Sequence, residues 1–318
     1  MQRLARLAGY ATLLVTPAAL LGRSIAVPTD SSVAVLGLGG GVALAGGVAA
    51  AVEYDDALTG SKTPTAEYTD ATSVAVVAAA AAVTSLLSVD AGLGPVVASA
   101  LVGAVTGVGV PDVDTAAYCG SFVGMASPAV FPAVEFVLLA GALAGLAFVA
   151  AKETFAGLGG KLGTLALFGC VTTGLLPGVA FGPGAPPQWG NLAFTVPVAV
   201  GSAVLTIALS ERLDLGPVLA SSLVGLAAGL VAPVAFPDVG DLVATVAFCS
   251  SFVGMSTTER VESAGGAGLA GALCGVVFVA VAPAFGGAGG KLGTVAFVAC
   301  LSVFGAGELR NALVPHAP

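Results

Sequence analysis

Charged side chains are scarce in this sequence. Of its 318 residues, 9% are charged and 57% are hydrophobic, whereas about 25% of the residues of an ordinary soluble domain are charged. The mean hydropathy is +1.03. A chain so poor in charge cannot cover a globule with polar groups, so its surroundings must be largely lipid. The composition therefore predicts an all-α, multi-pass integral membrane protein of the cell membrane, with the lipid bilayer as a partner.

Histidine is almost absent, and the cysteines show no ligand pattern. The one histidine, His316, lies two residues from the end of the sequence. This excludes Ser-His-Asp catalysis, Cys-His catalysis and histidine metal sites, unless the tail folds back. The five cysteines lie in apolar runs without a Cys-x-x-Cys spacing, so we interpret them as small buried residues. We expect no enzyme, no metal, no cofactor and no nucleic-acid partner.

Isoleucine and lysine are rare as well, with two and four residues respectively. Alanine, valine and glycine fill the apolar stretches instead, and the net charge is −8. Such usage is typical of a GC-rich genome and, together with acidic loops, of a halophile.

The first 71 residues precede the repeated part of the chain. Two arginines come before the apolar run 7–21, and no clean cleavage site follows, which favours a retained helix over a signal peptide. Residues 33–52 form a second apolar run. Residues 53–70 carry five acidic residues and Lys62. We interpret them as a solvated loop.

The remaining chain contains an internal duplication. Residues 119–170 align with 249–300 at a constant offset of 130, and 25 of the 52 positions are identical. Two motifs recur whole, Ser-Phe-Val-Gly-Met and Gly-Gly-Lys-Leu-Gly-Thr. The complete units extend over 72–184 and 191–308, followed by a tail, 309–318. A duplication of this size predicts two related bundles rather than a solenoid.

Each unit has four clear apolar spans and one ambiguous segment. With the two N-terminal helices, this predicts about 10–12 transmembrane helices. The expected spans are 72–89, 94–110, 135–151 and 164–180, matched by 191–210, 216–234, 265–283 and 294–306.

The ambiguous segments are 115–127 and 242–256, which are too short for an ordinary span. They are either steep short spans or re-entrant half-helices, and we expect them to face the interior of the bundle. Four spans per unit give parallel repeats, whereas five give inverted ones. Five spans place eight of the ten Lys and Arg residues inside and two outside, and four spans divide them equally. The positive-inside rule thus favours inverted repeats.

The Gly-Gly-Lys-Leu-Gly-Thr motifs are the main candidates for a binding site. Their glycines can break a helix and free backbone amides, and the threonines can cap the helix that follows. Free amides beside a lysine attract anions. The alternative is a glycine-rich turn whose lysine reaches the headgroups. The candidate substrate-binding residues are Gly159, Gly160, Lys161 and Thr164, with Gly289, Gly290, Lys291 and Thr294.

Two further repeated pairs are weaker candidates. Ser121 and Ser251 offer hydroxyl groups to a solute, although packing of small residues explains the same pattern. Asp112 and Asp238 each follow a proline at the end of a span and are candidates for ion coupling. The alternative is that these carboxylates mark the membrane surface and cap the next helix.

These motifs match no family pattern that we recognise, so the expected function rests on the architecture. The leading hypothesis is a transporter or channel for a small solute or ion, possibly an anion, with its pathway between inverted repeats. The alternatives are a non-transporting scaffold or assembly subunit and, less favoured, a membrane enzyme. A homo-oligomer is compatible with either of the first two.

Overall fold

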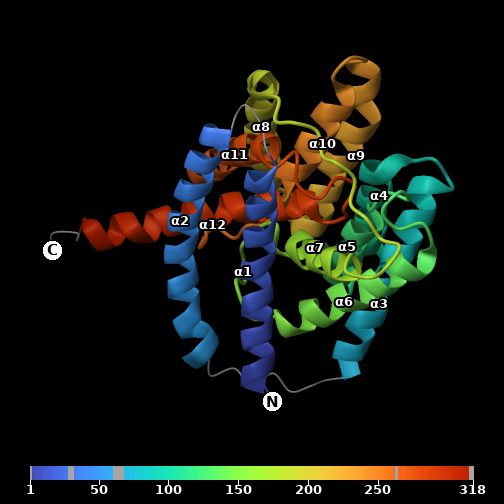
Figure 1. The fold of residues 1–318 in the computed structure, drawn as a ribbon, viewed down its shortest axis with the longest axis horizontal. Coiled ribbons are helices and arrows are strands. Elements are labelled where there is room, and N and C mark those ends of the chain that lie inside the picture. The colour runs from blue at the N-terminus through green and yellow to red at the C-terminus, as the bar shows by residue number, and fades with distance from the viewer. Residues whose placement is uncertain (1, 28–31, 60–67, 262–263, 315–318) are drawn as a thin grey trace.

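The fold is all-helical in the part of the chain that the structure describes (Figure 1). The computed structural model describes residues 2–27, 32–59, 68–261 and 264–314, so Lys62 and His316 lie outside it. Two short 3₁₀ turns, Trp189–Asn191 and Val253–Met255, accompany the α-helices. These helices are α1 (Gln2–Ala26), α2 (Ser32–Thr59), α3 (Tyr68–Val89), α4 (Gly94–Gly109), α5 (Asp114–Gly124), α6 (Val134–Ala150), α7 (Lys161–Thr173), α8 (Leu192–Arg212), α9 (Pro217–Ala235), α10 (Gly240–Ser251), α11 (Ala264–Ala280) and α12 (Lys291–Leu313).

Six of these helices are long and apolar enough to cross a membrane, namely α1, α2, α3, α8, α9 and α12. Of the shorter helices in the two units, α4, α6, α7, α10 and α11 are also apolar. An all-helical chain with six such helices is consistent with a multi-pass membrane protein, as the composition predicts. The predicted spans match the observed helices of the two units closely with one exception, and two predicted boundaries outside the units also differ.

The exceptions concern helix ends. The predicted span 164–180 is wrong, because α7 ends at Thr173 and its 13 residues extend only about 20 Å at 1.5 Å per residue. The predicted loop 53–70 is too long, since α2 continues to Thr59. The predicted tail 309–318 also begins too early, because α12 continues to Leu313.

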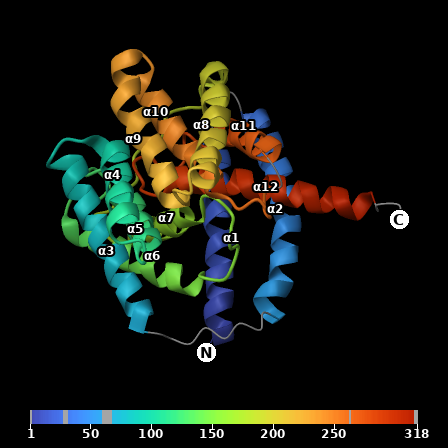
Figure 2. The ribbon, with the colours of Figure 1, turned by 180° about the vertical axis from the view of Figure 1, so that it is seen from behind.

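The two units use equivalent helices in equivalent contacts. Helix α3 packs against α6 in the first unit, and α8 packs against α11 in the second. Between the units, α4 packs against α9 and α7 against α12. In both ribbon views α3 extends toward the end of the molecule where the N-terminus lies, whereas α8 and α9 extend toward the opposite end (Figures 1 and 2).

Contacts between the units recur with the partners exchanged. The amide of Ser127 donates to the carbonyl oxygen of Gly287 at 2.8 Å, and the amide of Thr257 donates to that of Gly157 at 2.9 Å. Thr257 is the counterpart of Ser127 and Gly157 is the counterpart of Gly287, because each pair is 130 positions apart. A Cβ atom on Gly163 would lie 2.5 Å from the Cα of Gly293, and one on Gly293 would lie 2.6 Å from the Cα of Gly163.

Helix α1 touches an equivalent point of each unit. Its Gly9 lies against the backbone of Ala150 and Ala151 at the end of α6. Its Ser24 Oγ donates to the carbonyl oxygen of Ala280 at the end of α11, at 2.7 Å. Positions 150 and 280 are equivalent at the offset of 130. The two contacts are 15 residues apart on α1, or about 22 Å along the helix.

Candidate functional site

The short segments α5 and α10 form the centre of the molecule. Every residue of α5 from Ala116 to Gly124 is buried, and most of α10 is buried as well. The prediction that these segments face the interior is therefore confirmed. Their small residues allow close packing: a Cβ on Gly120 would lie 2.1 Å from the Val77 carbonyl oxygen of α3.

Two phenylalanines of the repeated Ser-Phe-Val-Gly-Met motifs meet at this centre. The rings of Phe122 and Phe252 have centroids 4.7 Å apart. Tyr118 lies 4.4 Å from Phe122, and its counterpart Phe248 lies 4.7 Å from Phe252. We call these four rings the aromatic cluster. Because such tilted pairs are favourable and the rings are at most 2% exposed, the cluster is a tightly packed, buried contact between the units.

Hydroxyl groups surround the aromatic cluster. Ser121 shares a hydrogen bond of 2.8 Å with Ser99, and Ser251 shares one of 2.8 Å with Ser221. The Tyr118 hydroxyl lies 2.9 Å from Ser221. Ser121 and Ser251 thus already hold neighbouring helices together. Sequence reasoning missed Ser99 and Ser221, although both occur in a repeated Leu-Gly-Pro-containing segment that would have identified them.

The glycine motifs form two equivalent turns, the first glycine turn (residues 151–160) and the second glycine turn (residues 281–290). Gly160 and Gly290 have φ angles of 81° and 79°, which favour glycine, and helices α7 and α12 begin directly after them. A Cβ on Gly159 would lie 2.2 Å from the Phe252 carbonyl oxygen, and one on Gly289 would lie 2.5 Å from that of Phe122. The structure therefore brings the glycines of each motif against the phenylalanine of the other unit.

The predicted threonine caps are wrong. No side chain caps α7 or α12, because a left-handed glycine occupies the N-cap position of both. Thr164 and Thr294 lie one turn further on, and their hydroxyls donate to the carbonyl oxygens of Gly160 and Gly290 at 3.2 and 3.1 Å. Their hydroxyls thus bond back within the first helical turn instead of capping free amides.

Both lysines donate to carbonyl oxygens of the glycine turn that precedes their own helix. Lys161 Nζ donates to the carbonyl oxygen of Lys152 at 3.1 Å. Lys291 Nζ donates to those of Ala282 and Ala284 at 3.0 and 2.6 Å. These carbonyl oxygens provide polar partners for both ammonium groups within the turns.

A cavity of about 160 Å³ lies beside Lys291. The first turn of α12 forms one wall, and Phe122 and Phe252 form the wall toward the centre. Thr245 and Met125 also line it, and no carboxylate does among the described residues. This cavity is the place where the glycines, a lysine and the aromatic cluster come together.

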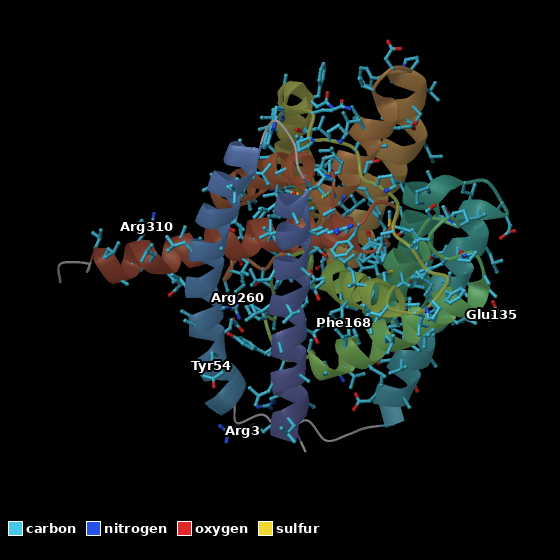
Figure 3. All side chains as sticks on the ribbon, in the orientation of Figure 1. Arg3, Tyr54, Glu135, Phe168, Arg260 and Arg310 are labelled. Carbon is cyan, nitrogen blue, oxygen red and sulfur yellow. The ribbon has the colours of Figure 1, made fainter. Side chains whose placement is uncertain are left out.

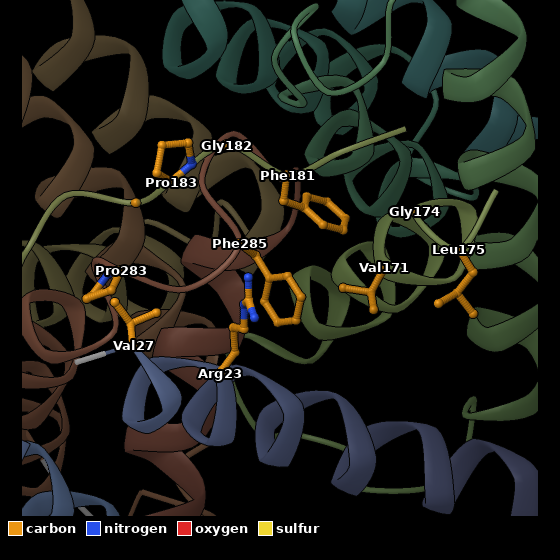
Figure 4. Close-up of a pocket in the computed structure, with 11 residues that line it drawn as sticks. Arg23, Val27, Val171, Gly174, Leu175, Phe181, Gly182, Pro183, Pro283 and Phe285 are labelled. Carbon is orange, nitrogen blue, oxygen red and sulfur yellow. The ribbon is translucent and has the colours of Figure 1, made fainter. Parts of the chain in front are cut away.

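The predicted ion-coupling residues are not part of this centre. Asp112 and Asp238 are exposed, in the turns after α4 and α9. Asp238 lines a separate cavity of about 520 Å³ near the loop before α8. A third cavity, of about 560 Å³, lies at the end of α1, where Arg23 points toward Phe285 and Gly182 (Figure 4). The C-terminal ends of α1 and α7 meet there, so the arginine offsets their partial negative charge.

One buried ion pair was missed by sequence reasoning. Glu53 of α2 pairs with Arg260, and their side chains are 3% and 20% exposed. Glu53 belonged to the segment interpreted as a loop. The sequence did contain one indication of this pair, because the position of Arg260 in the second unit is occupied by an apolar residue, Val130, in the first.

Comparison with known proteins finds no matching family model, no matching curated protein and no matching solved structure. The class of protein is therefore defined by the chain alone, whose described residues are helical and include six helices suited to a bilayer.

Proposed function

We propose that the protein is a cell-membrane transporter or channel for a small solute, with a pathway between two inverted repeats. The contacts of α1 support the inversion. Equivalent ends of α6 and α11 touch α1 at Gly9 and Ser24, about 22 Å apart. If α1 crosses the bilayer, these two points are separated along the membrane normal. A two-fold axis that relates them must be perpendicular to that direction and therefore lies in the membrane plane. Both glycine turns then lie at membrane depth, where non-helical backbone is tolerated only inside protein or beside a water-filled cavity.

The observation that carries the proposal is the cavity that ends on Phe122 and Phe252. Phe122 and Phe252 are counterparts in the duplication, so the symmetry that relates the two units would exchange them. From the repeat we expect an equivalent approach, past Lys161, to reach the same ring pair from the other side. Two approaches to one closed barrier from opposite sides of a membrane are the geometry of a gated pathway.

The cavity limits the solute in size and charge. Its volume of about 160 Å³ corresponds to about five water molecules at about 30 Å³ each. Lys291 lines it together with the N-terminal turn of α12, both of which carry positive potential. This favours a neutral or anionic solute over a cation.

Flux into proteoliposomes tests the proposal. We expect wild-type protein to admit small neutral or anionic solutes faster than protein-free vesicles do. Phe252→Ala removes half of the ring pair and should raise the flux severalfold. Phe131→Ala is the matched control, because Phe131 is buried and stacked on Phe136, outside the cluster. Vesicles that stay inert with both wild type and Phe252→Ala would instead support the scaffold hypothesis.

A further inference from the structure

The cavity of about 560 Å³ at the end of α1 combines one arginine with apolar walls. Arg23 is its basic residue, and no carboxylate lines it among the described residues. Its apolar walls come from the end of α7, the loop before α8 and the second glycine turn, and include Val171, Leu175, Phe181, Pro283 and Phe285. The cavity is therefore positively charged and has no described counter-charge.

The first glycine turn shows which groups occupy the equivalent place in the other unit. Oε2 of Glu53 accepts a hydrogen bond from the Phe155 amide at 3.1 Å, and Oε1 pairs with Arg260. Arg260 Nε donates to the carbonyl oxygen of Ala156 at 3.0 Å. Figure 3 shows Arg260 beside α2. The first turn is thus held at residues 155 and 156 by an oxyanion together with an arginine.

The second glycine turn has the same backbone but lacks the oxyanion. Phe285, the counterpart of Phe155, has a φ of 45° against 51°, so the two turns share an unusual conformation. No described residue accepts a hydrogen bond from the Phe285 amide. The carbonyl oxygen of Gly286, the counterpart of Ala156, accepts the Gly182 amide at 3.0 Å.

An arginine is nevertheless present at the second turn. Arg23 comes from α1 and points toward Phe285 and Gly182 (Figure 4). The second turn therefore offers a guanidinium and a backbone amide, which are the two kinds of donor that hold the Glu53 carboxylate at the first turn.

We infer that this cavity binds the phosphate of an anionic phospholipid. The phosphate oxygens take the place that the Glu53 carboxylate has in the first turn, and they accept hydrogen bonds from Arg23 and from the Phe285 amide. A guanidinium presents two parallel N–H groups to a phosphate, so this pairing is strong and directional. Binding requires no covalent step, and it does not depend on transport.

The position and the walls of the cavity favour a lipid as the source of the phosphate. Arg23 lies in the last turn of α1, within the candidate span Arg3–Ala26. If α1 crosses the bilayer, this arginine lies near the level of the headgroups, where basic pockets recognise anionic lipids. Leu175 is 81% exposed at the rim and offers apolar surface to an acyl chain. A free phosphate ion presents the same oxygens but leaves the apolar walls without a partner.

The lipid site shares a wall with the turn that binds Lys291. Pro283 lines the cavity, and it stands between Ala282 and Ala284, whose carbonyl oxygens accept hydrogen bonds from Lys291. A lipid bound beside Pro283 therefore steadies the backbone that positions Lys291. This consequence for the pathway rests on the proposed function, whereas the lipid binding itself does not.

Thermal unfolding of the purified protein in detergent tests the inference. The protein is unfolded in micelles that contain phosphatidylglycerol or phosphatidylcholine, and in plain micelles with inorganic phosphate. A ligand that binds the folded state raises the unfolding temperature. We expect phosphatidylglycerol to raise it by several degrees more than phosphatidylcholine does, and Arg23→Met to abolish this difference. Arg212→Met is the matched control, because Arg212 is also exposed in the last turn of a candidate span and lines none of the three cavities.

The comparison of variants decides whether the site exists and which ligand fills it. A phosphatidylglycerol effect that Arg212→Met keeps and Arg23→Met loses supports the lipid site. An equal effect of inorganic phosphate, lost in the same variant, supports the phosphate site with a soluble ligand. If Arg23→Met does not fold, Arg23→Gln takes its place with the same expectation. The inference is overturned if wild type does not distinguish the two lipids, or if Arg23→Met responds as wild type does. Inert proteoliposomes would refute transport and leave this lipid response unaffected.

Discussion

Gly293→Ala is expected to lower the free energy of unfolding by about 3 kcal/mol, near the upper end of ordinary overpacking costs. The new Cβ would lie 2.6 Å from the Cα of Gly163 and 3.0 Å from its amide nitrogen. Both atoms belong to the backbone of the first turn of α7, so no side chain can move aside. Thermal unfolding of purified protein in detergent measures the effect.

Gly201→Ala is the matched control for this prediction. Gly201 lies within α8 and is exposed, and a Cβ added there would have no neighbouring atom within 4 Å. Alanine is the better helix former, so this change should stabilise the protein by about 0.5–1 kcal/mol. Equal and small effects of the two substitutions would show that α7 and α12 do not cross at these glycines.

Lys291→Met is expected to destabilise the protein by about 2–3 kcal/mol, because two carbonyl oxygens lose their donor. Lys161→Met should cost about 1 kcal/mol, since Lys161 donates to one carbonyl oxygen and Lys291 to two. Methionine keeps the bulk of the side chain. Thermal unfolding of both variants, with solute flux measured alongside, distinguishes a lysine that hydrogen-bonds the backbone carbonyl oxygens from a lysine that binds the solute. A loss of flux without a loss of stability would restore the interpretation of these lysines as an anion site.

The helices of this fold could be predicted from apolar run length, because few polar residues interrupt a span. The burial of α5 and α10 could also be predicted, since short helices with hydroxyl groups fit lipid poorly. The role of Thr164 could not, because helix starts depend on backbone angles, and the left-handed Gly160 takes the N-cap position. The ammonium groups find carbonyl oxygens nine residues or fewer away, an arrangement that the turn geometry alone decides.

Glu53 illustrates a different limit of sequence reasoning. Its acidic neighbours at 55 and 56 give the segment the composition of a loop. Its partner lies 207 positions later, at Arg260. Only tertiary packing brings the two charges together, and only then does their burial become visible. The departure of Arg260 from the repeat was the one local indication.

Sidedness of equivalent positions tests the inverted arrangement most directly. Asp90 and Arg212 lie at equivalent helix ends of the two units, Asp112 and Asp238 lie in equivalent turns, and all four side chains are exposed. The native cysteines are all buried, so the unsubstituted protein serves as the blank. Each position is changed to cysteine and labelled in intact cells with a membrane-impermeant thiol reagent, before and after permeabilisation. We predict that one member of each pair reacts in intact cells and the other only after permeabilisation. Labelling of both members of a pair from the same side would contradict the inverted repeats and, with them, the pathway proposed between the two units.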